Sequence, residues 1–392
     1  MIAASLPSHR LAHQLFSTHP RTAYRPFAAR QFASRRILLM AWGHLPLLFA
    51  ACCLSCALQA QRASPAAPLD IRVMAIPAAH KVSITAGGLP FTEFFYPDTL
   101  EKPILYPVFA PDGQLVSRGF PFQPRPGEPV DHPHHQGIWF TYENVNGLDF
   151  WNNSFAIPAD KKHSYGWIRT DGSSIKVSDG KNGTLQYGAD WTDQQKNVLL
   201  RETTIFIFTA TAQERIIDRS TTLTAAQDVS LPDAKDGLLG MRVTKELQIP
   251  SSAPGQFIDS KGNITKVAAG NDPVINGTYL TSTGKQGDSA WATRGNWCLL
   301  YGKKGNDTLS IAIIDHPSNP GYPTYWHARG YGLFAANPLG QKIFSQGKET
   351  LAFSLKKGQS VTFRYRIVIA AEKGRLSTGR IGQLADAFAG QR

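Results

Sequence analysis

Three histidines crowd into four positions of one short segment, Glu128 to Asn152, which reads EPVDHPHHQGIWFTYENVNGLDFWN. We call it the histidine segment; it places Asp131 directly before His132, His134 and His135. Neutral imidazole accepts protons and ligates metals, and protonated imidazole donates protons near neutral pH. A carboxylate beside such a ring orients it. We therefore expect a catalytic site here, with His134 or His135 as acid or base and with Asp131 and His132 as their partners.

A second segment, Ile313 to Gly340, repeats part of this plan. It contains Asp315-His316-Pro317 where the histidine segment has Asp131-His132-Pro133, and it carries one more histidine, His327. Beyond residue 62 the chain has seven histidines, and five of them lie in these two segments. Loops held on a rigid sheet are the usual carriers of binding chemistry. We expect the two segments to meet at one pocket and to combine their imidazoles there.

A glutamate in a strand-like stretch is a candidate for a second acid or base. In LLRETTIFIF, Glu202 shares one face of the expected strand with Leu200 and two phenylalanines. A carboxylate on an apolar face is either exposed at a strand end or enclosed in a cavity, where burial raises its pKa. The alternative is a partly exposed ion pair with Arg201 or Arg215.

Aromatic, amide and charged side chains are frequent in the same two segments and near them. Flat rings pack against sugar C–H groups, and amides, carboxylates and guanidinium groups bind hydroxyls. The expected substrate-binding residues are Arg118, Trp139, Asn146, Asp149, Trp151, His316, Trp326, His327 and Arg329. The competing interpretation is that the tryptophans fill the hydrophobic core.

Two further functions stay open beside acid/base catalysis. His132, His134 and His135 with an aspartate could coordinate Zn²⁺ or a similar divalent ion, although their spacing is no signature of a known zinc class. A non-catalytic glycan-binding module is the third hypothesis. It ranks last because sugar binding does not require so many ionisable groups. Phosphate-loop, dinucleotide, G-x-S-x-G and zincin motifs do not occur in the sequence.

The elements that must position these loops look like β-strands. Short runs rich in Val, Ile, Thr, Phe and Tyr are separated by Gly, Pro, Asn and Asp. In QSVTFRYRIVIA, residues 359–370, apolar side chains alternate with Thr362, Arg364 and Arg366. A helical stripe of Ile381 and Leu384 with Phe388 occurs near the end of the chain. We predict an all-β fold, a large antiparallel β-sandwich with a short C-terminal helix.

The first residues of the chain predict export. The chain carries a formal charge of +12, but residues 1–62 contain seven arginines and no Asp, Glu or Lys. The remainder has 34 basic and 29 acidic side chains, which is no indication of nucleic-acid binding. Ser34-Arg35-Arg36 before an apolar run resembles a twin-arginine signal, and it is favoured over a lipid anchor at Cys52 or Cys56. We expect a periplasmic or extracellular protein without a transmembrane span in its mature chain.

These observations give an expected domain organisation. Residues 1–60 form an export signal or leader, residues 61–69 a linker, and residues 70–392 a single β-sandwich domain. The alternative is a split into two domains near residue 250, where PSSAPGQFIDSKGN is loop-like. The sequence leaves the number of subunits open.

Several stretches are similar to one bacterial family. Residues 95–152, from FYPDTLEKP to the end of the histidine segment, closely resemble the DUF6807 or "PmoA-like" family, and so do GLLGMRV, WATRGNWCLLYG and residues 311–340. The resemblance covers about residues 70–390. It implies a secreted β-rich protein with a supersandwich similar to galactose mutarotase, a group in which His and Glu do acid/base work on sugars. It assigns no catalytic residue here. The label methane oxygenase does not fit, because the membrane methane monooxygenase subunit is a bundle of spanning helices.

The residues and the resemblance together favour an exported carbohydrate-active enzyme, which would be a hydrolase, a lyase or an epimerase. The expected partner is a carbohydrate substrate. The only cofactor considered is the divalent metal of the alternative hypothesis.

Overall fold

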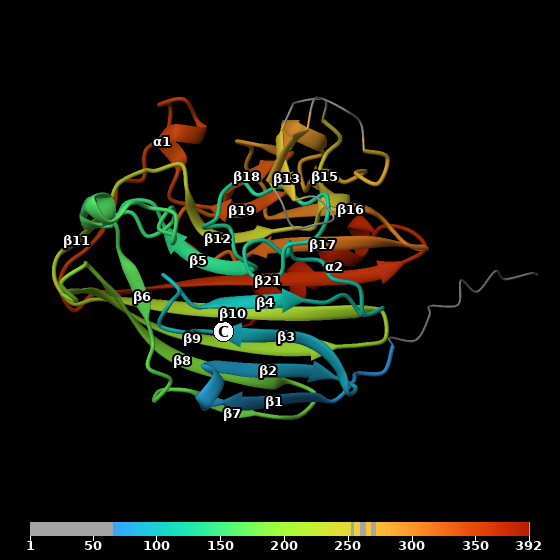
Figure 1. Ribbon diagram of the computed structural model, residues 1–392, viewed down its shortest axis with the longest axis horizontal. Helices are drawn as coiled ribbons and strands as arrows, with labels where there is room; N and C mark the ends of the chain where they lie inside the picture. The colour runs from blue at the N-terminus through green and yellow to red at the C-terminus, as the bar shows by residue number, and fades with distance from the viewer. Residues whose placement is uncertain (1–65, 252–254, 259–263, 268–271, 392) are drawn as a thin grey trace, which may run out of the picture. The chain divides into compact units, whose positions relative to one another are not determined.

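The structure is a computed structural model that describes residues 66–251, 255–258, 264–267 and 272–391. These residues form mainly β-strands, which are arranged in two large antiparallel sheets (Figure 1). The predicted all-β fold, with antiparallel sheets and a short C-terminal helix, is confirmed. The leader predicted for residues 1–60 and the first part of the linker lie outside the described residues. The unit described below is formed by residues 62–392.

The first sheet has eight strands and carries the histidine segment at its middle. Their order is β1 (Ile71–Ile76), β2 (Lys81–Ala86), β3 (Leu89–Phe95), β4 (Ile104–Val108), β5 (Ile138–Tyr142), β12 (Gly237–Arg242), β19 (Leu333–Asn337) and β18 (Tyr325–Arg329). Strand β5 lies within the histidine segment, just after its three histidines, whereas β18 and β19 belong to the second segment. Only β12 separates β5 from β19, so segments about 190 residues apart in sequence lie one strand apart in the sheet.

The second sheet lies behind the first in the view of Figure 1. Its order is β15 (Thr278–Thr281), β16 (Trp297–Lys304), β17 (Asp307–Asp315), β21 (Ser360–Glu372), β10 (Glu214–Ala225), β9 (Val198–Ala210), β8 (Gly183–Thr192) and β6 (Trp167–Arg169), with β7 (Lys176–Ser178) also paired to β8. Strands β9 and β10 form an antiparallel pair in which Phe206 lies opposite Arg219.

Smaller elements complete the described chain. Two short pairs are β11 (Val229–Leu231) with β20 (Phe353–Leu355), and β13 (Gly255–Ile258) with β14 (Ile264–Val267). Strand β13 lies inside the stretch 250–263 that was expected to be a loop. The helices are α1 (Gln341–Phe344) and α2 (Thr378–Ala389), with 3-10 turns η1 (Pro77–Ala79), η2 (Ala159–Ser164), η3 (Lys245–Leu247) and η4 (Gly287–Ala290). None of the described helices is long and apolar enough to cross a bilayer.

The main core lies between the two sheets and is rich in aromatic rings. Phe94 on β3 lies 4.5 Å from the ring of Tyr187 on β8, and Phe140 on β5 lies 6.0 Å from Phe363 on β21. Alternate residues of a strand point to opposite faces, so each sheet contributes one apolar face to this core. The opposite face of each sheet packs against other parts of the chain.

Helix α2 covers part of the outer face of the second sheet. On β21, Phe363 and Ile367 face the main core, whereas Val368 and Ala370 belong to the apolar group that includes α2. The buried residues of α2 are Ile381, Leu384, Ala385 and Phe388, which contain the predicted stripe. The Ser377 side chain caps the helix by accepting a hydrogen bond from the backbone N–H of Arg380.

The outer face of the first sheet carries a separate apolar group. It contains Trp139 and Ala335, with Trp151 and Leu100 from the loops beside β5 and β4. Directly paired residues of antiparallel strands share a face. Trp139, Gly240, Ala335 and His327 therefore form one row across β5, β12, β19 and β18, on the face turned away from the main core.

A glycine in this row makes room for two indole rings. A Cβ on Gly240 would lie 2.6 Å from Trp139 and 2.7 Å from Trp151. Real Cβ atoms do not approach so closely, so the packing of both tryptophans requires glycine at this position. The floor of the candidate site is therefore rigid and densely packed.

Candidate active site

Two buried arginines hold Asp131 at the centre of the histidine segment. Oδ1 of Asp131 accepts hydrogen bonds from Arg118 at 2.9 Å and from Arg242 on β12 at 2.6 Å, and Oδ2 accepts one from Nδ1 of His132 at 2.5 Å. Burial raises the pKa of Asp131, but the bond from His132 and the two guanidinium charges outweigh it and hold that pKa well below its usual value. Asp131 is therefore ionised at neutral pH and fixes the orientation of His132.

The sequence predicted that Arg118 binds substrate, but its hydrogen bonds in the structure shape the loop instead. Its side chain is fully buried, and its guanidinium donates to the backbone carbonyls of Pro129, Asp131, His132 and His135 at 2.8–3.2 Å. These bonds, with that to Asp131, engage both terminal nitrogens. The physical role of Arg118 is therefore to fold residues 129–135 around one charge.

His132 is held in an unusual backbone conformation. Its φ of 47° lies in the left-handed region, which costs energy for residues other than glycine. Asn, Asp and His are the side chains found there more often than others. Its side chain is 39% exposed, and Nε2 has no hydrogen-bond partner among the described residues. Because Nδ1 donates to Asp131, Nε2 of the neutral ring is a free acceptor that reaches solvent.

A stack of four rings joins the histidine segment to the second segment. Tyr331, between β18 and β19, lies 4.9 Å from His132 with planes 5° apart; His132 lies 4.7 Å from His135, and His135 lies 5.2 Å from Trp139. Arg242 lies 4.8 Å from the Tyr331 ring. The two segments therefore meet, although the contact is made by Tyr331 and not by a second Asp-His-Pro turn.

The tautomer of His135 follows from its partner. Nδ1 of His135 lies 3.0 Å from a terminal nitrogen of Arg242, and a guanidinium can only donate. Nδ1 must therefore be the acceptor, and the proton of the neutral ring lies on Nε2. Burial, with the neighbouring His134 and Arg242, lowers the pKa of His135 well below its ordinary value, so the ring is neutral at pH 7.

His134 lies beside this stack and keeps both ring nitrogens free of hydrogen bonds to the described residues. Its ring packs edge-on against His132 at 5.6 Å and His135 at 4.3 Å. None of the hydrogen bonds among the described residues involves this ring, and neither nitrogen is among the buried unpartnered atoms. Burial, followed by the charge of Lys102, lowers the pKa of His134 well below its usual value. His134 is thus a neutral, accessible imidazole.

Lys102 is a site residue that the sequence did not reveal. It precedes β4, is 2% exposed, and its ammonium lies over the Trp139 ring at 5.8 Å. Its one hydrogen bond goes to the backbone carbonyl of Trp151 at 3.3 Å. Burial lowers the pKa of Lys102 to about 8, against the opposing charges of Glu101 and Asp149. A lone lysine in a loop gives no sequence signal for such a position.

Two carboxylates, Asp236 and Glu143, lie close to each other near His327. Nδ1 of His327 on β18 lies 3.4 Å from Oδ1 of Asp236, and the backbone N–H of Asp236 donates to Glu143 at 2.8 Å. Burial and the charge of Glu143 raise the pKa of Asp236 to about 6, although Lys235 opposes this. Burial, followed by the charges of Lys235 and Arg329, lowers the pKa of His327 to about 3. Asp236 precedes β12 and was not predicted.

Asp149 and Asn146 mainly hold their own loop. Oδ1 of Asp149 accepts from the backbone N–H groups of Trp151 and Asn152, and its pKa is raised by burial. Asn146 occupies a left-handed turn position, with a φ of 53°, and its amide ties this turn to Asp228 and Ser230. The expected substrate-binding role of Asn146 has no support in this geometry.

Glu202 lies in the main core and is not part of this group. Its carboxylate accepts from Tyr187 and Thr204 at 2.6 Å, from Trp191 at 2.8 Å and from Arg219 at 2.9 Å, and it is 2% exposed. All these partners lie on β8, β9 and β10 of the second sheet. The expectation of a catalytic Glu202 is replaced by a structural ion pair with Arg219, which is neither of the two arginines considered.

The second Asp-His-Pro turn also lies elsewhere. Its residue His316 packs against Phe388 of α2 at 5.0 Å, and its Nδ1 contacts Ser318 at 2.7 Å. Asp315 is buried, accepts from Asn319 and Thr324, and burial raises its pKa to about 7. This turn belongs to the second sheet, and Trp326 on β18 belongs to the main core. The expected binding roles of His316 and Trp326 therefore find no support.

Arg329 and the two expected tryptophans of the histidine segment do belong to the site. Trp139 and Trp151 are fully buried and form its floor with their rings 5.1 Å apart. The guanidinium of Arg329 lies 5.1 Å from the ring of Trp291 and 5.9 Å from that of Tyr331. Trp291 comes from the loop before β16 and was not predicted.

The three histidines do not fit a metal site. Among the described residues, no three or more His, Cys, Asp and Glu side chains are grouped so that they could hold a metal ion. Asp131 is already shared by Arg118 and Arg242, and His135 accepts from Arg242. The charges of these arginines and of Lys102 would repel a divalent cation.

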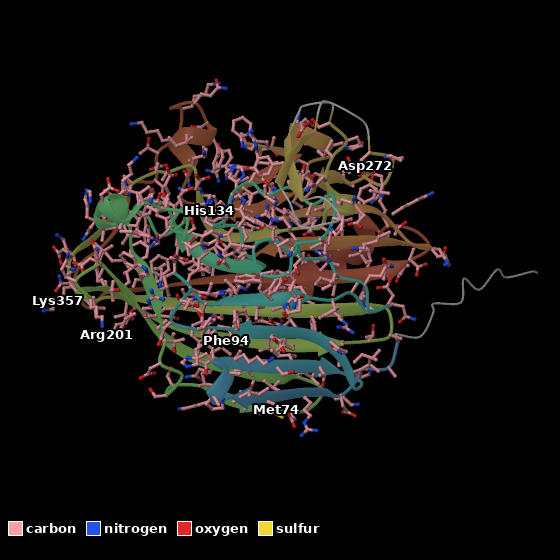
Figure 2. The ribbon with its side chains drawn as sticks, in the orientation of Figure 1. Met74, Phe94, His134, Arg201, Asp272 and Lys357 are labelled. Atoms are coloured by element: carbon pink, nitrogen blue, oxygen red, sulfur yellow. The ribbon has the colours of Figure 1, made fainter. Side chains whose placement is uncertain are left out.

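A hollow on the second sheet is separate from these histidines. It measures about 910 Å³, lies at the β6 edge of the second sheet, and is lined by residues that include Trp167, Asp190 and Arg201 but no histidine. In Figure 2, Arg201 and His134 are far apart. We place the candidate site at His134 because the perturbed ionisable groups gather there, whereas this hollow is mainly an open groove.

Comparison with known proteins places the chain in a family. A family described as "Family of unknown function (DUF6807)" matches residues 81–386. No curated protein matches the chain.

Several solved structures of carbohydrate enzymes show a low similarity. A GH36 α-galactosidase from Geobacillus stearothermophilus is 10% identical with a TM-score of 0.35, over 77% of this chain and 41% of that one. A putative aldose 1-epimerase from Escherichia coli K12 is 10% identical with a TM-score of 0.30, over 77% of this chain and 98% of that one. A galactose mutarotase-like protein from Clostridium acetobutylicum is 11% identical with a TM-score of 0.32, over 78% of this chain and 99% of that one. The mutarotase-like proteins that the resemblance implied are thus among the similar structures, but scores this low indicate nothing about activity. The match over residues 81–386 spans most of the chain, which therefore belongs to the DUF6807 family.

Proposed function

We propose that this chain is an exported enzyme that transfers protons on a carbohydrate substrate, as a hydrolase, a lyase or an epimerase. The observation that carries the proposal is the Asp131–His132 pair. A half-buried, ionised carboxylate binds Nδ1 of an imidazole whose Nε2 is accessible. This arrangement fixes the tautomer and stabilises the imidazolium that forms when Nε2 takes a proton.

The neighbours of His132 supply the other half of acid/base chemistry. Asp236, with a pKa raised to about 6, is still protonated in about a tenth of the molecules at pH 7, far more often than an ordinary aspartate, and can donate. The charges of both Asp131 and Asp236 act on Tyr331. We assign His132 as the base and Asp236 as the acid, with His134 as a neutral hydrogen-bond partner of the substrate.

A sugar is the substrate class that the surrounding side chains favour. Tyr331 and Trp291 present aromatic surface at the rim, Arg329 lies between them, and His134 offers free nitrogens inside. Aromatic faces beside polar groups suit a ring that has C–H faces and hydroxyl edges. The label "PmoA-like" remains a resemblance and adds nothing to the proposal.

The test is turnover of a panel of oligosaccharides and polysaccharides, with products followed by chromatography and NMR. We use His132→Asn, because Asn tolerates the left-handed φ of this position better than other replacements. Activity should fall about 100-fold or more. His163→Gln, at an exposed histidine bonded only to the Asp160 carbonyl, should retain it.

Two outcomes contradict the proposal. Full activity of His132→Asn excludes His132 as the base. Saturable glycan binding without any product supports the glycan-binding module instead. As a further check on the acid, kcat/KM should decrease as the pH rises through about 6, where Asp236 loses its proton.

Export is a separate part of the proposal, because the leader lies outside the described residues. It predicts that the protein in a native host is recovered outside the cytoplasm with an N-terminus near residue 60. Recovery of the uncleaved chain in the cytoplasm would contradict it.

A further inference from the structure

Arg329 is a cation at the rim of the site with no acceptor. Its guanidinium is stacked between Trp291, which is 39% exposed, and the half-buried Tyr331. Among the described residues, no hydrogen bond or ion pair involves this guanidinium. Its five N–H donors are nevertheless held in one orientation by the two rings.

Three buried arginines of the site and core are paired with carboxylates. Arg242 donates to Asp131, Arg219 to Glu202, and Arg366 to Asp218. A guanidinium matches a carboxylate with two parallel hydrogen bonds. Arg329 presents this fork without such a partner, beside the ring of Tyr331 that stacks on His132.

The nearby acids do not satisfy Arg329. Asp236 lies 3.4 Å from His327 and 3.5 Å from Lys235. The carboxylate of Asp288 approaches the backbone of Gly330, where a Cβ would lie 2.9 Å from it, but it makes no ion pair with Arg329. The guanidinium of Arg329 therefore has no carboxylate partner among the described residues.

We propose that Arg329, Trp291 and Tyr331 form a subsite for the carboxylate of a uronic acid residue. This inference rests on the proposed function, since it assigns a substrate class to the same site. The aromatic rings pack against the sugar C–H groups, and the guanidinium binds the carboxylate through two hydrogen bonds. The subsite directs an acidic saccharide toward His132.

The experiment compares binding of free uronates with their methyl esters, which have the same skeleton without the charge. The probes are trimers of galacturonate, glucuronate and mannuronate, titrated by calorimetry into the full-length protein. At least one free acid should bind about tenfold or more tightly than its ester. Arg329→Gln should abolish this preference, and Arg329→Lys should retain part of it, because the charge remains but the fork is lost.

The controls separate this inference from the proposed function. Arg72→Gln removes an exposed cation on β1, and Asp288→Asn removes the acid beside Gly330; both should keep the preference for the free acid. Equal binding of acids and esters, or an unchanged preference in Arg329→Gln, overturns the subsite. Arg329-dependent binding of glucose 6-sulfate without binding of any uronate overturns the carboxylate assignment.

Binding is also measured in His132→Asn. Loss of turnover with unchanged uronate binding supports both proposals. Arg329-dependent uronate binding by a wild-type protein that turns over no saccharide leaves the subsite standing and refutes the enzyme.

Discussion

Removing Glu202 should destabilise the protein strongly without affecting the chemistry of the site. The carboxylate is 2% exposed and accepts four hydrogen bonds, one of them from Arg219, whose guanidinium also lies 4.7 Å from the Phe140 ring. Glu202→Leu would leave the Arg219 charge buried and unpaired between the sheets. Breaking a buried pair in this way costs about 3–5 kcal/mol, a large part of the stability of an ordinary protein.

The assay is urea unfolding followed by tryptophan fluorescence, with Arg201→Gln as the matched control. Arg201 neighbours Glu202 but is exposed on the opposite face, so its replacement should change the free energy of unfolding by no more than about 0.5 kcal/mol. The double variant Glu202→Leu/Arg219→Met should recover much of the loss, because no charge then remains unpaired. A loss below about 1 kcal/mol in Glu202→Leu, or a double variant less stable than it, would refute the reasoning.

Two further predictions concern packing and ionisation. Gly240→Ala should lower the free energy of unfolding by about 1–3 kcal/mol, because its Cβ would collide with Trp139 and Trp151. The control is Gly379→Ala in α2, which has no atom within 4 Å of its Cβ and should stabilise the helix slightly. Thermal unfolding that shows no loss of stability in Gly240→Ala would contradict the packing. The pKa of Asp315 is raised from 3.8 to about 7, so the folded state keeps a proton that the unfolded chain releases, and the free energy of unfolding should fall by up to about 4 kcal/mol as the pH rises from about 4 to above 7. Asp315→Asn should flatten this dependence in urea unfolding at pH 5 and 8, and an equal slope in both proteins would rule out Asp315 as its source.

The fold was predictable because its signals are local. In β21 the alternation of apolar and polar residues places Phe363 and Ile367 in the main core, and in α2 the spacing of Ile381, Leu384 and Phe388 gives one buried stripe. Both patterns depend only on the period of a strand or a helix. The concentration of imidazole in the histidine segment was equally visible in the sequence.

The remainder of the site depends on which strands are neighbours. The stacking of Tyr331 on His132 exists because β12 and β19 lie beside β5, and no local pattern encodes that order. Lys102 and Asp236 are single residues before strands, and only burial in the folded protein shifts their pKa values. Asp315-His316 repeats the sequence of Asp131-His132 but lies in the other sheet, so sequence similarity alone was misleading.

The burial of Glu202 shows the same limit. The apolar face of its strand was predicted, but an ion pair with Arg219 is formed across β9 and β10, and the sequence offered several arginines as partners. An enclosed carboxylate can be catalytic or structural, and only the identity of its partners separates the two roles.

The most direct test of the central claim is the position of the proton on His132. Long-range ¹H–¹⁵N NMR of the neutral ring, assigned by comparison with His132→Asn, should show the proton on Nδ1, bound to Asp131, and a bare Nε2 that can accept a proton. A proton on Nε2, or rapid exchange between both tautomers, would contradict the account.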